Sequence, residues 1–230
     1  MSILDAIIQG VVQGLTEFLP VSSSGHLAIT QHILGAGTGE SNLFFNVMLH
    51  VGTLVAVVAF YHKLVWDLIK EFFLMLKDIF TGKFKWSKMN YNRNLVVMLI
   101  IGLIPLFLLF LPIPGTDMKL KDLADQLSAS PVLIVTACSL ILTSVLLTIG
   151  IIRNRKSVAS THKHLATKSN AKATRDNFNV VDAILVGVTQ VCAALLPGLS
   201  RSGSTLSVGE MRGISKQKAL DYTFVLLSLI

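Results

Sequence analysis

Long apolar blocks alternate with short polar segments along this chain. The blocks at 43–61, 95–111 and 131–152 approach the ~20 residues that an α-helix needs to cross a bilayer, so we predict a spanning helix in each. Residues 64–80 mix charged with large apolar residues, which favours an amphipathic helix lying at the membrane surface. The pattern therefore predicts an all-α, polytopic membrane protein.

The first apolar block, residues 2–19, is predicted to be helical and carries a polar side chain at every fourth position. These side chains belong to Asp5, Gln9, Gln13 and Glu17. Residues four apart stack on one face of a helix, so the stripe either packs against another helix or faces a site. We favour a site, because a carboxylate and a chain break end the stripe and polar groups at membrane depth are costly.

The chain break comes directly after this helix. Pro20 ends the helix, and a polar turn follows, made of Ser22, Ser23, Ser24, Gly25 and His26. A serine is a preferred N-cap, so a second helix is expected over 26–34, too short to span a bilayer. Two short helices joined by a break predict a re-entrant hairpin, because broken backbone at membrane depth must be buried in protein or line a cavity.

The last third of the chain repeats the first at an offset of 177 residues. The matched segments are 5–13 with 182–190, 19–20 with 196–197 and, after one inserted residue, 22–25 with 200–203. The two copies differ in charge, since Ala194 takes the place of Glu17 and Arg201 the place of Ser24. One copy thus supplies a carboxylate and a histidine and the other a guanidinium, so neither turn alone is a complete site.

Basic residues predict an orientation for these copies. Segments 63–93 and 153–178 are strongly basic and 113–129 is not, so the positive-inside rule places the first two in the cytoplasm. Residues 1–42 then lie outside, and the first hairpin opens outward while the second copy starts from the cytoplasm. The copies are therefore inverted, as in transporter folds whose broken helices meet near the bilayer midplane. We expect 153–175 to be a flexible loop.

Composition supports a membrane protein. Hydrophobic residues make up 52% of the 230 positions and charged residues 14%, with a mean hydropathy of +0.67. The net charge of +7 comes from the basic segments, so we expect anionic lipid rather than nucleic acid as the partner. Cys138 and Cys192 lie in apolar blocks without metal-ligand spacing and are expected to pack.

We treat 1–230 as a single integral-membrane domain, with repeat one at about 1–112 and repeat two at about 131–230. The N-terminus has neither a basic region nor a small-residue cleavage site, so we expect no signal peptide. Because the chain stops inside an apolar block, we expect a truncated C-terminus and an incomplete second repeat.

The turn PGLSRSGST at 197–205 suits an anion. Backbone N–H groups at a helix start bind anions, and arginine binds phosphate through two hydrogen bonds. Together with the opposing turn at 22–25, it suits a phosphate and, better, a pyrophosphate. The residues we expect to bind substrate are Gln13, Ser22, Ser24, Gly25, Ser200, Ser202, Gly203 and Thr205. The alternative, that serines and glycines only cap helices and allow close packing, explains either turn taken alone.

Reactive groups accompany these turns. Glu17 and His26 can serve as general base and general acid, or His26 can activate a serine. Glu17 and Gln13, one helical turn apart, can also hold a divalent cation such as Mg²⁺ or Ca²⁺ through oxygen ligands. A phosphate site inside a membrane implies an amphiphilic substrate, with its tail in lipid and its head in the cavity.

Two motifs carry a family resemblance. QGLTE at 13–17, followed by FLPVSSSGH, resembles the (E/Q)xxxE signature of the undecaprenyl-diphosphate phosphatase family of the bacitracin-resistance (BacA) type, and 197–205 resembles its PGxSRSxxT signature. The resemblance covers the whole chain. It implies a multi-pass cell-membrane enzyme of bacteria that converts a C55 isoprenyl pyrophosphate to the monophosphate and phosphate and so recycles the lipid carrier of cell-wall synthesis. By the topology inferred above, we expect its active site to face outward.

The resemblance also implies catalytic residues, namely Glu17, Ser23, His26 and Arg201. Glu17 is then a base or metal ligand and Arg201 a pyrophosphate clamp, while the nucleophile is either Ser23 or His26. The partners are a polyprenyl pyrophosphate lipid and the membrane, with a homodimer as one assembly. A flippase or transporter of a polyprenyl phosphate lipid is the alternative, because inverted repeats with broken helices are typical of carriers. A third hypothesis, a structural membrane subunit, ranks last because it leaves the matched polar turns unexplained.

Overall fold

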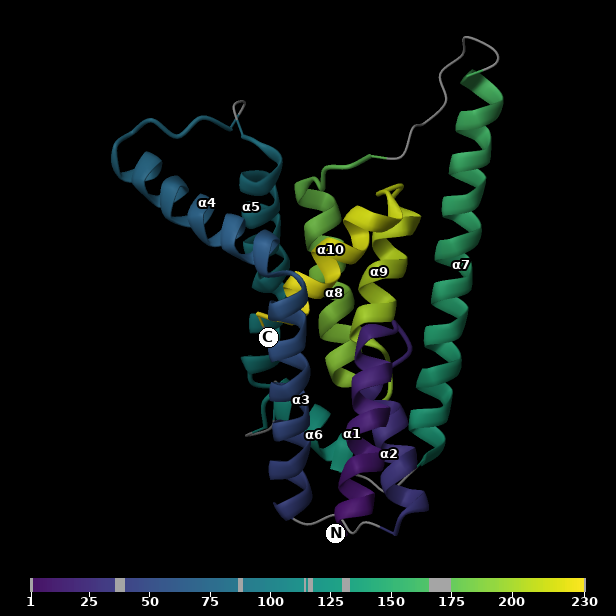
Figure 1. The fold of residues 1–230 in the computed structure, drawn as a ribbon. Coiled ribbons are helices and arrows are strands. Elements are labelled where there is room, and N and C mark those ends of the chain that lie inside the picture. Colours follow the sequence, from purple (N-terminus) through teal and green to yellow (C-terminus); the bar gives the residue numbers. More distant parts are fainter. Residues whose placement is uncertain are drawn as a thin grey trace.

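The computed structural model describes residues 2–35, 40–86, 89–113, 115, 118–129, 133–165 and 175–229. These residues fold into helices (Figure 1). In chain order the helices are α1 (Ile3–Phe18), α2 (Ser23–Ile33), α3 (Glu40–Phe60), α4 (His62–Phe80), α5 (Tyr91–Leu103), the 3₁₀-helix η2 (Ile104–Phe110), α6 (Leu120–Ala129), α7 (Leu133–Leu165), α8 (Val180–Leu195), α9 (Arg201–Met211) and α10 (Lys216–Leu227).

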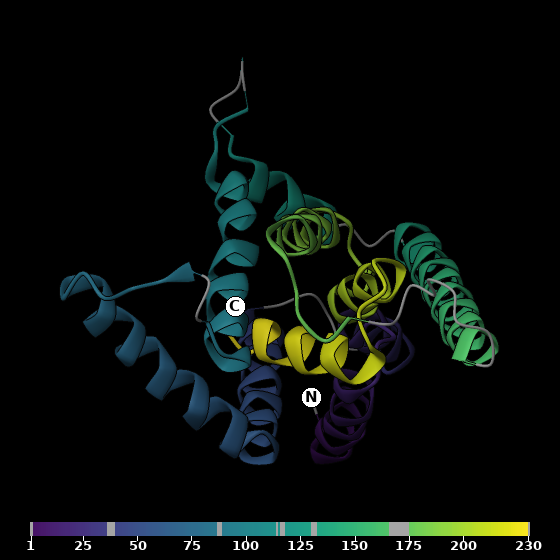
Figure 2. The same ribbon diagram turned by 90° about the horizontal axis from the view of Figure 1, so that it is seen from above.

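Candidate membrane spans agree in part with the apolar blocks. Tyr91–Phe110 and Ile134–Asn154 are long and apolar enough to cross a membrane, each with a mean hydropathy of 2.3. Helices α3 and α4 make up a third candidate only as a bent pair, since the chain turns by 83° between them. Viewed from above, α4 projects away from the bundle, as a helix lying along a membrane surface does (Figure 2).

One prediction fails in the middle of the chain. Residues 153–165 are not loop but continue α7, which runs without interruption for 33 residues. Basic residues such as lysine and arginine have good helix propensity, so a helix that leaves the apolar block needs no break at its first arginine. The rest of the predicted loop, up to residue 174, lies outside the described residues.

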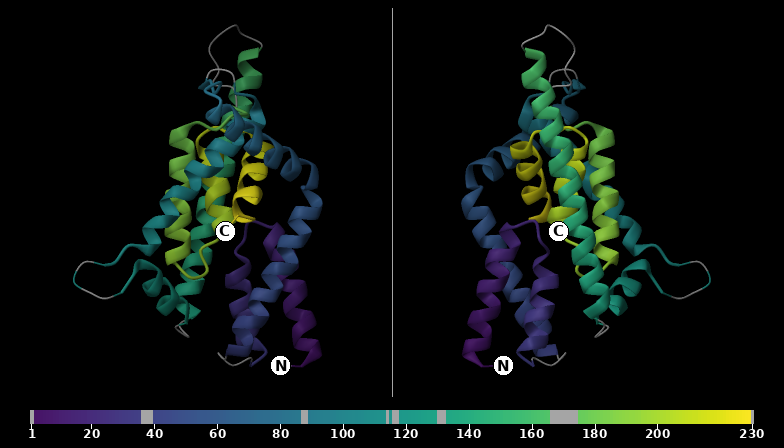
Figure 3. Two further views of the ribbon diagram at one scale, coloured as in Figure 1. Left: turned by 90° about the vertical axis from the view of Figure 1, so that its left-hand side faces the viewer. Right: turned by 90° about the vertical axis from the view of Figure 1, so that its right-hand side faces the viewer.

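The matched segments form two helical hairpins that point in opposite directions. Helices α1 and α2 pack together and enter from one end of the molecule, and α8 and α9 pack together and enter from the other (Figures 1 and 3). The tips of the hairpins meet at the middle. The basic ends of α4 and α7 lie at the end opposite to the N-terminus.

The two hairpins begin with the same local device. In α1, Ser2 caps the helix and Asp5 caps Ser2 in return, and in α8, Asn179 and Asp182 form the same reciprocal capping box. Asp5 therefore does not face a site, contrary to the predicted stripe. Further along the stripe Gln9 and Gln13 are buried. The residues of the stripe thus have different roles: Asp5 caps the helix, the two glutamines are buried, and Glu17 lines the cavity described below.

The second helix of each hairpin also begins in the same way. Ser22 caps α2 by accepting a hydrogen bond from the N–H of Gly25, and Ser200 caps α9 by accepting one from the N–H of Gly203. This register pairs Ser22 with Ser200, so Arg201 stands opposite Ser23. The constant offset had placed it opposite Ser24, because it ignored the inserted residue.

Glycines let the two tips touch. A Cβ atom on Gly203 would collide with the carbonyl oxygen of Pro20, and a Cβ on Gly25 would lie 3.4 Å from the Cα of Gly198. Backbone of one hairpin thus rests directly on backbone of the other. Small residues allow this kind of close approach between helices in membranes.

The second hairpin is anchored in the main hydrophobic core. The hydroxyl of Tyr222, on α10, donates to the carbonyl of Met98 on α5 over 2.7 Å, and its ring stacks on Phe178 at 4.1 Å. Asp182 is fully buried and forms ion pairs with Arg175 at 3.0 Å and Arg212 at 2.7 Å. These contacts fix the base of the second hairpin, where α8 begins and α9 ends, near α5 and α10.

We expect Gly203→Ala to lower stability by about 1–3 kcal/mol, because the added methyl group must push the two backbones apart. Gly14→Ala is the matched control, since a Cβ there meets nothing within 4 Å. Thermal unfolding of the purified protein in detergent, followed by tryptophan fluorescence, measures both. A Gly203→Ala variant as stable as Gly14→Ala would show that the tips are not in contact.

Candidate functional site

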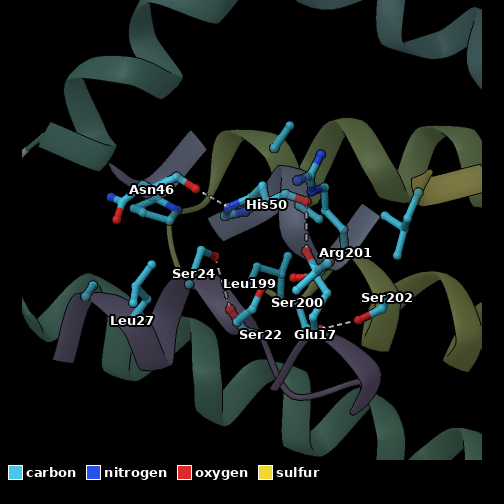
Figure 4. Close-up of a pocket in the computed structure, with 18 of the residues that line it drawn as sticks. Glu17, Ser22, Ser24, Leu27, Asn46, His50, Leu199, Ser200, Arg201 and Ser202 are labelled. Atoms are coloured by element: carbon cyan, nitrogen blue, oxygen red, sulfur yellow. Dashed lines mark hydrogen bonds between the residues drawn. The ribbon is translucent and has the colours of Figure 1, made fainter. Parts of the chain in front are cut away.

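A cavity of about 780 Å³ lies where the hairpin tips meet (Figure 4). Its polar lining comes from both hairpins, from α3 and α7 and from the end of α10. The polar lining residues are Glu17, Ser22, Ser23, Ser24, Gln31, Asn46, His50, Thr53, Thr136, Ser200, Arg201, Ser202 and Ser228. Two segments about 180 residues apart in the sequence therefore line one cavity.

Two helix N-termini open into this cavity. Ser23 and Ser24 occupy the first turn of α2, and Arg201 and Ser202 occupy the first turn of α9, and all four line the cavity. The first N–H groups of a helix have no partner within the helix, and they carry the positive end of its dipole. The cavity is thus a place where two positive helix ends converge, which favours an anion.

Arg201 and Glu17 carry the formal charges of the cavity lining. Both line the cavity and interact electrostatically, from opposite hairpins (Figure 4). Glu17 accepts a hydrogen bond of 2.9 Å from the Nε2 of Gln13, one turn earlier in α1. Gln13 itself is fully buried and holds the Glu17 carboxylate in place without lining the cavity.

Ser22 has a strained backbone at the entrance to α2. Its φ of 72° and ψ of 91° lie in a region that side-chain-bearing residues rarely adopt, whereas its counterpart Ser200 has an ordinary φ of −66°. Strain of this kind costs about 1–3 kcal/mol and collects at functional sites. Ser22 also accepts, through its carbonyl, a 2.8 Å hydrogen bond from Nδ1 of His26.

Several residues expected at the site do not line the cavity. These are Gln13, Gly25, His26, Gly203 and Thr205. Gly25 and Gly203 provide the contact between the tips, and Thr205 is buried with its hydroxyl bonded to the carbonyl of Arg201. These three residues match the alternative reading, in which they cap and pack, and they position the residues that do line the cavity.

The sequence left open whether Asn46 and His50, inside the apolar block at 43–61, are site residues or bond to a neighbouring helix, and it did not single out Thr53. Asn46, His50 and Thr53 line the cavity and are spaced four and three residues apart, so they lie on one face of α3. Nε2 of Gln31 donates to Oδ1 of Asn46 over 2.7 Å and to Oε1 of Gln9 over 2.9 Å. Three polar residues at helical spacing inside an apolar block were the available signal.

Apolar side chains complete the lining of the cavity. Val47, Val51, Leu54 and Val57 come from α3, and Phe224 and Leu227 from α10. A lining that mixes charged and polar groups with apolar side chains suits a ligand that is charged at one end and hydrocarbon at the other.

The residues present fit only one kind of metal site. Among the described residues, no group of three or more His, Cys, Asp and Glu side chains could hold an ion. Glu17 contributes one carboxylate, and Oε1 of Gln13 is buried without a hydrogen-bond partner. This donor set fits a Mg²⁺ ion held by one carboxylate and completed by ligand phosphate oxygens and water, not a site built from protein alone.

We expect Arg201→Gln to weaken the binding of inorganic pyrophosphate about 10- to 100-fold, because it removes a charge-assisted hydrogen-bond pair. Arg153→Gln, an exposed arginine on α7 away from the cavity, is the matched control and should bind as the parent does. Isothermal titration calorimetry in detergent measures both. Equal affinity of the two variants would remove Arg201 from the anion site.

Comparison with known proteins places this chain in a family. Residues 6–230 match the family model described as "Bacitracin resistance protein BacA". An undecaprenyl-diphosphatase of Alkaliphilus metalliredigens is 38% identical over 227 residues, which are 98% of this chain and 72% of the relative. Proteins of the same name from Methanobrevibacter smithii and Parabacteroides distasonis are 36% and 33% identical, covering 98% and 99% of this chain and 72% and 71% of the relatives. The chain therefore belongs to the bacitracin resistance protein BacA family.

Proposed function

We propose that this protein is an undecaprenyl-diphosphatase, which hydrolyses undecaprenyl pyrophosphate to undecaprenyl phosphate and inorganic phosphate. The observation that carries the proposal is the convergence of two helix N-termini and Arg201 on one cavity that is also lined by apolar side chains. Relatives that carry this name cover nearly the whole chain. The reaction recycles the lipid carrier of cell-wall synthesis.

The two helix ends divide the work of binding. A pyrophosphate has two phosphoryl groups, and the first turns of α2 and α9 each offer N–H groups to one of them. Arg201 reaches across to clamp the pair, and the apolar residues of α3 and α10 receive the first part of the prenyl chain. Ser22 and Ser200 cap the two helices, and these caps keep both helix starts at the cavity.

Ser23 is the nucleophile that this geometry favours over His26. Ser23 lines the cavity, whereas His26 does not, and Nδ1 of His26 is held by the carbonyl of Ser22. The Ser23 oxygen attacks the terminal phosphorus and passes its proton to Glu17 or to Nε2 of His26. The anhydride P–O bond breaks, and undecaprenyl phosphate leaves with the bond's electron pair. Water then cleaves the phosphoserine and releases inorganic phosphate.

Glu17 has a second role in this scheme. It is the residue that would hold a divalent cation, which when bound supplies positive charge to the phosphate oxygens and so stabilises the transition state. The 2.9 Å hydrogen bond from Gln13 orients the carboxylate for either role. His26, at the third position after Ser23 on α2, lies near enough along the helix to take part in proton transfer.

A lipid flippase is the second candidate. The observation in its favour is the opposite direction of the two hairpins, with a cavity where their tips meet. In carriers with inverted repeats, a site at that level is reached alternately from the two sides. Such a protein would bind a polyprenyl phosphate at the same arginine and release no inorganic phosphate.

The same arrangement supports a membrane topology. We infer two inverted repeats, each with a re-entrant hairpin followed by spanning helices, in a cell membrane of the bacterial type. The ends of α4 and α7 carry basic residues and are placed in the cytoplasm by the positive-inside rule, so the first hairpin opens outward. A homodimer stays a prediction, which the mass of the protein in detergent would decide.

We expect Ser23→Ala and Glu17→Gln each to lower kcat for phosphate release from undecaprenyl pyrophosphate by about 100-fold or more, because each removes a group that acts in the transition state. Asp67→Asn, on the outer face of α4, is the matched control and should keep the parental rate. A parent protein that binds the lipid but releases no phosphate would exclude the phosphatase and leave the flippase. Full activity of Ser23→Ala would show that Ser23 is not the nucleophile.

A pair of introduced cysteines tests the orientation. Asn177 and Lys121 are exposed near opposite ends of the bundle, and the native Cys138 and Cys192 are first replaced by alanine. In intact cells we expect a membrane-impermeant maleimide to label Lys121→Cys and to spare Asn177→Cys. Detergent-solubilised protein, in which both sites should react, is the control. The opposite pattern in cells would reverse the topology.

A further inference from the structure

One histidine lines the cavity without a part in the scheme above. His50 lies on α3, on the same face as Asn46 and Thr53, and borders the cavity that holds Glu17 and Arg201 (Figure 4). Histidine is the side chain whose charge changes between pH 5 and 8. His26, the histidine in the motif, borders no part of this cavity.

The hydrogen bonds of His50 define which ring nitrogen is available. Nδ1 lies 2.9 Å from the carbonyl oxygen of Asn46, one turn earlier. A carbonyl oxygen can only accept, so Nδ1 must carry the hydrogen in this contact. In the neutral ring Nε2 is therefore an acceptor, and it becomes a donor only when the imidazole is protonated. An anion bound in the cavity gains a hydrogen bond from Nε2 only in that charged form.

A network across three helices holds this wall in place. Gln31 on α2 donates to Asn46 on α3 and to Gln9 on α1, and Thr53 donates to the carbonyl of His50 over 2.9 Å. The wall that carries His50 is thus tied to both helices of the first hairpin. Its position relative to the start of α2 is fixed before any ligand binds.

The charged neighbours of His50 are few. Within the cavity they are Glu17 on α1 and Arg201 on α9, while the lining residues of α2, α7, α8 and α10 are uncharged. The charges of α4, which continues from the end of α3, begin at His62 and Lys63, about 18 Å further along the helix axis by its rise of 1.5 Å per residue. A second positive group on α3 would add to the charge of Arg201, which comes from α9.

We propose that His50 is a substrate-binding residue that grips the pyrophosphate in its protonated form and makes its binding stronger as the pH falls. Nε2–H of the imidazolium donates to a phosphate oxygen from the α3 part of the lining. The inference rests on the proposed function for the identity of the ligand. The sign follows from the hydrogen bond of Nδ1: the imidazolium donates through Nε2 and the neutral ring does not, so this contact weakens as the pH rises.

The test compares ligand affinity with pH in two proteins. The probe is the non-hydrolysable methylene bisphosphonate analogue of farnesyl pyrophosphate, titrated calorimetrically in detergent from pH 5.5 to 8.5. The probe itself changes charge in this range, so the quantity that matters is the difference between parent and variant. We expect the Kd of the parent to rise about tenfold more than that of H50Q, because glutamine donates at every pH and does not titrate.

His62→Gln is the matched control. His62 is exposed at the start of α4, and its Nδ1 likewise contacts a backbone carbonyl, that of Ala59, at 2.8 Å. It should reproduce the pH dependence of the parent. An H50Q protein with the same pH dependence as the parent would overturn the proposal.

A measurement on the unmodified protein makes the test independent of variant folding. Diethyl pyrocarbonate reacts with unprotonated ring nitrogens, and mass spectrometry reports labelling at each histidine. We expect the bisphosphonate to protect His50 and to leave His62 labelled; equal labelling of His50 with and without the probe contradicts the proposal. Phosphate release by the parent is measured alongside. If the parent binds with the expected pH dependence but releases no phosphate, the phosphatase proposal fails and the role of His50 stands.

Discussion

At the centre of this molecule, two turns approach so closely that Gly203 has no room for a Cβ atom beside the carbonyl of Pro20. This contact is made from backbone, and it joins segments that lie far apart in the sequence. It places the starts of α2 and α9 on one cavity, and each start is capped by the serine that precedes it. The positions of Ser23 and Arg201 follow from those starts. The site therefore depends first on glycines, whose lack of a side chain lets the two tips meet, and only then on the polar groups.

The same contact explains how charge can be kept inside a mostly apolar bundle. Arg201 faces a carboxylate from the other hairpin, and two helix dipoles point their positive ends at the same space. Without a ligand, the cavity has more positive than negative character, and an anion relieves this imbalance. An ion pair alone would not need two helix ends, so the arrangement fits a doubly phosphorylated head group better than a structural pair.

The sequence predicted those features that depend on local rules. Caps, chain breaks and the repeat can be read from residue types and spacing, and the two hairpins were located in this way, including the meeting of Glu17 with Arg201. It did not predict that α7 continues to Leu165. The basic residues after the apolar block indicated a loop, although nothing local stops a helix at a basic residue. It also gave more weight to His26 than to His50. Which histidine borders a cavity depends on how α3 packs against the hairpins. The spacing of Asn46, His50 and Thr53 indicates a polar face on α3 but not what that face packs against.

The two copies of the repeat have also divided their tasks. In the first, Gln13 donates to Glu17 and so serves the cavity. In the second, the equivalent Gln190 donates to the carbonyl of Gly102 over 3.3 Å, and Ala194 replaces the carboxylate. A Cβ atom on Gly187 of α8 would collide with the carbonyl oxygen of Gly102, so α5 and α8 approach closely here and this glutamine binds the second hairpin to the core. An equivalent pair of glutamines thus positions a reactive group in one hairpin and anchors the scaffold in the other. A site at the junction gains from this asymmetry, because one half is held rigid while the other half carries the carboxylate, the serine and the histidines.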